Sequence, residues 1–142
     1  MAKFLTNLVL TFSPNDTVGT KYYVSQPFLY QSDVLNRIVT VPSGFPTDLA
    51  SVPKIPFLYE KFGNKNNYAA VIHDYLYTSG RGVDREHADR VFLEASNLLN
   101  PDNKAVNKLM YWAVRVFGAS HYQQKWLYKL LFQFYARWQH LS

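Results

Sequence analysis

The chain has 142 residues, 48% of them hydrophobic and 17% aromatic, which is long and apolar enough for one folded domain with its own core. It contains no cysteine, which excludes disulfides, thiolate metal sites and cysteine nucleophiles. The net charge of +5 suits nucleic acid, an anionic membrane or an acidic partner, although a basic soluble protein requires none of these.

The N-terminal part of the chain predicts a small antiparallel β-sheet. Residues 3–12 alternate loosely between apolar and polar side chains and are predicted to form one strand. Residues 21–24 and 28–30 are also rich in β-forming side chains, and a break is expected between them at Pro27. Residues 37–41 predict the clearest strand because they contain several β-branched side chains.

Residues 44–66 form a Pro-rich loop in which neither a long helix nor a central strand is expected. Loops braced in this way often carry functional residues on a rigid frame. Asp48 lies in this loop with Thr47 and Ser51 as neighbours, so it is a candidate cation ligand. A second interpretation stays open, in which Asp48 only caps a short turn.

From residue 67 onward, the spacing of apolar side chains predicts a bundle of about four helices. Asp84 is the expected N-cap of the second helix. The four helices are predicted over residues 68–78, 85–99, 104–117 and 122–140. The inward residues of the third helix are predicted to be Val106, Leu109, Met110, Ala113 and Val114.

The predicted architecture is a single α+β domain over residues 1–142. Its β-rich part covers residues 1–43, the Pro-rich loop covers residues 44–66, and the helical part covers residues 67–142.

The first predicted helix contains adjacent His73 and Asp74 among apolar residues, and burial of such a pair is costly unless each group has a partner. Asp89 on the second helix is the expected partner of His73, which would leave the other ring nitrogen free as a general base or ligand. Asp74 is rotated by about 100° along the helix, toward the loop, where it and Asp48 could hold a hard cation. The alternative is a satisfied core histidine beside an ordinary carboxylate.

Four segments are distinctive in combination: FPTDLASVP (45–53), AVIHDYLY (70–77), ADRVF (88–92) and MYWAVR (110–115). Together they resemble an uncharacterised phage and prophage family known only as a domain of unknown function. The resemblance runs from about Gly44 to Gly118 and implies a phage origin without an established chemistry.

His-Asp-x-x-Tyr on one helix followed by Ala-Asp-x-x-Phe on the next is also similar to the catalytic helix pair of phospholipases A2. This resemblance implies that His73 activates water, Asp74 binds calcium, Asp89 orients His73, and Tyr77 supplies a supporting hydroxyl. The sequence departs from that family because it has no disulfides, a short spacing from His73 to Asp89, and no glycine-rich calcium loop. The loop containing Asp48 would have to replace the calcium loop. Further supporting candidates are Thr47, Ser51 and His87.

Two functions follow from these patterns. The first is a phage-encoded metal-dependent hydrolase, acting on an ester or another acyl substrate, with a divalent ion for which calcium is favoured over zinc. The second is a non-enzymatic phage virion, tail or assembly protein in which the same polar cluster is structural.

The predicted C-terminal helix is basic and aromatic, and it is expected to form a wall of the core while its rim contacts partners. Other phage proteins or a membrane surface are the expected partners, and nucleic acid is not excluded. No signal peptide and no transmembrane segment are expected, so the predicted location is the host cytoplasm or the virion. The inward residues are predicted to be Leu127, Leu130, Leu131 and Phe134, with Arg137 and Trp138 at the rim.

Overall fold

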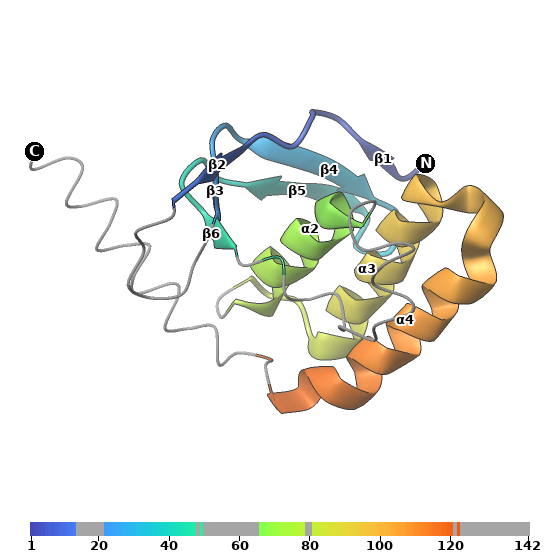
Figure 1. The fold of residues 1–142 in the computed structure, drawn as a ribbon. Helices are drawn as coiled ribbons and strands as arrows, with labels where there is room; N and C mark the ends of the chain where they lie inside the picture. Colours follow the sequence, from blue (N-terminus) through green and yellow to red (C-terminus); the bar gives the residue numbers. More distant parts are fainter. Residues whose placement is uncertain (14–21, 48, 50–65, 79–80, 121, 123–142) are drawn as a thin grey trace, which may run out of the picture.

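The computed structural model describes residues 1–13, 22–47, 49, 66–78, 81–120 and 122. Figure 1 shows the strands along one side and the helices along the other. The predicted α+β class is confirmed. The strands are β1 (Lys3–Phe4), β2 (Leu10–Phe12), β3 (Tyr22–Val24), β4 (Phe28–Ser32), β5 (Arg37–Val41) and β6 (Pro46–Thr47). The helices are α2 (Asn67–Tyr77), α3 (Arg85–Leu99) and α4 (Lys104–Phe117), with the 3₁₀ turns η1 (Pro101–Asn103) and η2 (Gly118–Ser120).

The strands form two antiparallel sheets, in the orders β1-β4-β5 and β2-β3-β6. The predicted single strand over residues 3–12 is therefore wrong, because its two ends belong to different sheets. Leu5 N still donates to Leu29 O, but Leu29 N then donates to the side-chain oxygen of Thr6 at 3.0 Å. A side chain thus takes the place of the backbone ladder, and the chain leaves the first sheet at this point.

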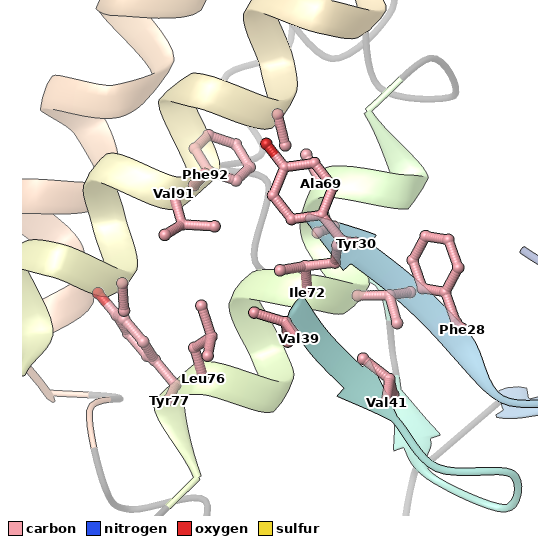
Figure 2. Packing of buried hydrophobic residues seen from close by; sticks show 14 of the residues in the cluster. Phe28, Tyr30, Val39, Val41, Ala69, Ile72, Leu76, Tyr77, Val91 and Phe92 are labelled. Carbon is pink, nitrogen blue, oxygen red and sulfur yellow. The ribbon is translucent and has the colours of Figure 1, made fainter. Parts of the chain in front are cut away.

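The larger hairpin, β4 with β5, supplies the β face of the core. Its register pairs Phe28 with Val41 and Tyr30 with Val39, and all four side chains are buried. Figure 2 shows them against Ile72 of α2. Alternate residues of a strand point to one face, so this hairpin presents a continuous apolar surface to the helices.

Helix α2 lies between the β4-β5 hairpin and α3, and it is buried on nearly every side (Figure 1). A helix that is apolar all round is typical of an interior position. Its buried residues include both His73 and Asp74. The two polar groups therefore depend on neighbouring elements for their partners.

Helix α3 begins where the sequence predicts, because Asp84 accepts a hydrogen bond from His87 N at 2.8 Å as its N-cap. Farther along α3, Glu94 joins the helix to the end of β4. Its Oε1 accepts from Tyr30 Oη at 2.8 Å and from Ser32 Oγ at 2.9 Å, while its Oε2 accepts from two backbone amides of the following turn. This carboxylate fixes the position of α3 against the sheet.

Helix α4 packs on the outer side of α3, with Met110, Ala113 and Val114 buried. Leu109 was expected to face inward as well, but it is 53% exposed. It shares an exposed apolar face with Trp112, Val116 and Phe117. The fourth predicted helix lies outside the described residues, apart from Tyr122. Among the helices in the described part of the chain, none is long and apolar enough to cross a membrane.

Candidate functional site

The predicted hydrogen bond between His73 and Asp89 is confirmed. His73 Nε2 of α2 lies 2.7 Å from Asp89 Oδ1 of α3, and the two side chains are 2% and 0% exposed. Both helices are positioned by apolar packing, with Phe92 placing its ring 5.3 Å from the imidazole. The pair is therefore held in the interior and screened from bulk water.

The Asp89 carboxylate has partners on both oxygens. Tyr77 donates its hydroxyl proton to Oδ1, the oxygen that also bonds His73. Arg115 of α4 donates to Oδ2 at 2.9 Å, and Arg85 Nε lies 3.9 Å from the same atom. Tyr77, the candidate supporting hydroxyl, thus contacts the Asp89 carboxylate.

These partners determine the protonation states of the cluster. Burial alone would raise the pKa of Asp89, but hydrogen bonds from His73, Tyr77 and Arg115 outweigh it and the pKa is lowered. Burial and then the hydrogen bond to Asp89 raise the pKa of Tyr77, so its phenol keeps the proton that it donates. An ionised Asp89 cannot donate, so His73 must donate from Nε2.

The other ring nitrogen of His73, Nδ1, is buried and has no hydrogen-bond partner among the described residues. When Nε2 carries the proton of the neutral ring, Nδ1 carries the lone pair. Buried polar atoms are normally paired, so an unpaired one indicates a site for a missing group. Within the described part of the chain, Nδ1 therefore carries a lone pair that no neighbouring group uses.

Asp74 contacts a different neighbour from His73 and faces Thr47, at the start of the segment predicted as a loop, as its place on the helix predicts. Thr47 at the end of β6 donates its hydroxyl to Asp74 Oδ2 at 2.8 Å, and both side chains are 2% exposed. The same hydroxyl accepts from Leu49 N at 3.1 Å. Leu49 has a φ of 58°, a left-handed conformation that strains a branched side chain and is typical of functional segments.

Two predicted site residues of this loop, Asp48 and Ser51, lie outside the described residues. His87, the remaining supporting candidate, lies away from the buried pair. Its Nδ1 is 2.7 Å from Asp84 Oδ1, and its side chain is 44% exposed at the start of α3. His87 therefore belongs to the helix cap.

The donors around Asp74 suit calcium better than zinc. A carboxylate and a hydroxyl are hard oxygen donors, which calcium prefers, whereas zinc selects imidazole and thiolate. Within the described residues, no group of three or more His, Cys, Asp or Glu side chains could hold a metal ion. Asp48, adjacent to Thr47 in the chain, is the expected second carboxylate.

Sequence patterns did not single out three residues that complete the cluster. Arg85 is four positions before Asp89, a spacing that signals an ion pair on one helix turn. Arg115 comes from α4 and Gly118 begins η2, and no local spacing relates them to Asp89. A β-carbon on Gly118 would lie 2.7 Å from Tyr77 Oη, so the backbone can approach this hydroxyl only at a glycine.

The chain matches the model of a family described as "Protein of unknown function (DUF1353)" over residues 22–114. No curated protein and no solved structure matches it. The matched range spans more than half of the 142 residues and includes His73, Asp74 and Asp89. The chain therefore belongs to this uncharacterised domain family.

Proposed function

We propose that this protein is a phage-encoded metal-dependent hydrolase that acts on an ester or another acyl substrate. The observation that carries the proposal is the imidazole of His73. Its Nε2 bonds a buried carboxylate, while its Nδ1 has no partner among the described residues. A histidine that only filled the core would be expected to satisfy both nitrogens.

In the proposed reaction, His73 takes a proton from water at Nδ1 as the water attacks the acyl carbon. The tetrahedral intermediate then collapses, the C–O bond to the leaving alcohol breaks, and the proton on Nδ1 passes to the departing alkoxide. Asp89 stays ionised, holds the ring through Nε2, and stabilises the positive charge that the ring acquires. Tyr77 donates to the same carboxylate oxygen and limits its rotation. The apolar surroundings of the ring strengthen these interactions because they exclude water.

Asp74, with Asp48 as a second ligand, would hold the divalent ion, for which calcium is the favoured candidate. Such an ion supplies positive charge that stabilises a developing oxyanion. The roles of His73, Asp74, Asp89 and Tyr77 follow the resemblance to the phospholipase A2 helix pair. The hydrogen bond from Tyr77 to Asp89 and the hydrogen bond from Thr47 to Asp74 support that resemblance.

A second candidate function has its own support. Through Arg115, Arg85 and His73, Asp89 joins three helices with charged and polar contacts. Such a network can serve only to fix the helices relative to one another. The protein would then be a non-enzymatic virion, tail or assembly component of a phage.

A calcium titration of the intact protein by calorimetry tests the proposal. We expect saturable binding to the wild-type chain and its loss in Asp74→Asn, which keeps an acceptor oxygen for Thr47. Asp102→Asn, at an exposed position of η1, is the control and should bind like the wild type. A folded wild-type chain that binds no calcium, or an Asp74→Asn variant that binds it equally well, would favour the second candidate.

A further inference from the structure

We propose that Arg115 is a positioning residue of the His73–Asp89 pair, which holds the Asp89 carboxylate so that Oδ1 faces the imidazole and His73 keeps a single tautomer. This inference rests on the proposed function, because it concerns the same base. The pair of His73 and Asp89 was expected from the sequence, whereas the third helix that completes it was not.

The two oxygens of the Asp89 carboxylate receive their donors from different helices. Oδ1 receives the donors from α2, His73 and Tyr77, and Oδ2 receives the guanidinium of Arg115 from α4. A carboxylate held on only one oxygen can rotate about its bond to the chain. Donors on both oxygens, coming from different helices, fix its plane.

The Asp89 carboxylate is also buried. With Arg115 in place Asp89 is 0% exposed, so its oxygens depend on protein donors and not on bulk water. Among the described residues, the cationic group left nearest to Oδ2 without Arg115 is Arg85, with its Nε at 3.9 Å. Rotation of the carboxylate toward Arg85 would weaken the bond from Oδ1 to His73 Nε2. The proton of the neutral ring could then move to Nδ1, which is the atom that must accept a proton in the proposed reaction.

Arg85 provides a matched control. It is 22% exposed against 26% for Arg115, and it carries the same charge near the same oxygen. It is beyond hydrogen-bond distance of Oδ2, and its NH2 group donates instead to the backbone carbonyls of Val114 and Arg115. Charge alone is thus common to both arginines, and the hydrogen bond to Asp89 belongs to Arg115.

The test is a two-bond ¹H–¹⁵N NMR spectrum of the imidazoles in the full-length protein, with His73 assigned by its loss in His73→Gln. The wild type should show the Nε2–H tautomer alone. Arg115→Gln should show a mixture of the Nε2–H and Nδ1–H tautomers. Arg115→Lys, whose amine is a single-point donor, should show a smaller share of the Nδ1–H tautomer than Arg115→Gln. Arg85→Gln and Arg85→Lys should keep the wild-type spectrum.

A single Nε2–H tautomer in both Arg115 variants would overturn the proposal, and so would equal mixtures in the Arg115 and Arg85 variants. If Arg115→Gln does not fold, the comparison of Arg115→Lys with Arg85→Lys decides alone. The spectrum does not depend on a substrate. A protein without hydrolytic activity that gives the expected spectra would refute the proposed reaction and leave the role of Arg115 in place.

Discussion

Asp89 has no exposed surface, although burial of a carboxylate in a protein interior costs several kcal/mol before partners are counted. Its partners offset that cost, because His73, Tyr77 and Arg115 all donate to it. Their combined effect lowers its pKa below the ordinary value of 3.8 despite the burial. At the scale of single residues, this carboxylate organises the site.

Replacement of Asp89 by asparagine should be costly at neutral pH. The amide cannot accept from His73 and Tyr77 on one side and from Arg115 on the other, since one of its two positions is a donor. We expect the free energy of unfolding to fall by about 3 kcal/mol. Urea denaturation followed by circular dichroism at about pH 7 measures the difference.

The same comparison has a defined pH dependence. The contribution of Asp89 is fully present above its unfolded pKa of 3.8, and it is lost as the pH falls through the lower folded value. The difference in the free energy of unfolding between the wild type and Asp89→Asn should therefore become smaller only below about pH 4. A difference in the free energy of unfolding that already becomes smaller between neutral pH and about pH 5 would show that the pKa of Asp89 is not lowered in the folded protein.

The sequence was sufficient to predict the His73–Asp89 contact. Two adjacent amphipathic helices each presented one polar group near an apolar face, and burial requires such groups to pair. Arg115 could not be found in this way. Its contact with Asp89 spans 26 positions along the chain and depends on how α4 packs against α3. Local periodicity predicts which face a residue occupies, but it does not relate two faces of separate helices.

At the scale of elements, the end of α4 closes one side of the cluster. A β-carbon on Gly118 would approach Tyr77 Oη to 2.7 Å and would meet Tyr77 Cε2 and Arg85 NH2 only at 3.6 Å. The hydroxyl is therefore the one severe obstacle. The close approach of α4 to α2 depends on a missing side chain at this position.

Gly118→Ala should destabilise the protein by about 1–3 kcal/mol because the new methyl group displaces Tyr77 or α4. Tyr77→Phe removes the hydroxyl, so the same alanine should cost much less in that background. A double-mutant cycle on the free energy of unfolding measures the coupling. Purely additive losses would mean that the two residues do not meet.

The strands show where sequence patterns fail at this scale. The alternation over residues 3–12 is real, but the pattern cannot reveal that the Thr6 side chain replaces the backbone as a hydrogen-bond acceptor. The single strand predicted there is therefore two strands, β1 and β2, and the single predicted sheet is two sheets. Leu109 was assigned inward by spacing alone, and its exposure follows from the narrow contact of α4 with α3.

At the scale of the whole molecule, Tyr122 connects the last part of the chain with the site. Its hydroxyl donates to Val83 O at 2.7 Å, and its ring packs edge-on at 5.3 Å from the ring of Tyr77. Tyr122, the second residue after η2, therefore packs against the helices around the cluster. The rest of the predicted C-terminal helix lies outside the described residues, so its role in the core stays a prediction.

Truncation before Tyr122 should therefore cause unfolding or aggregation. The control is Tyr122→Phe, which removes only the hydroxyl bond and should cost about 1 kcal/mol. Thermal unfolding of the purified chains measures the loss of stability in each variant, and light scattering detects aggregation. A soluble, fully folded truncated chain that loses only binding to a membrane or a partner would contradict the core role of the C-terminal segment.

Hydrolysis is the most direct test of the central claim, that His73 is a base held by Asp89. The measurement is acyl release from soluble esters and from phospholipid vesicles, with calcium present and after its chelation. We expect turnover by the wild type that requires calcium and falls by about a hundredfold or more in His73→Gln. Arg90→Gln, on the exposed face of α3, should retain full activity. Equal rates for the wild type and His73→Gln, or no hydrolysis of any ester by a folded, calcium-bound protein, would contradict the claim.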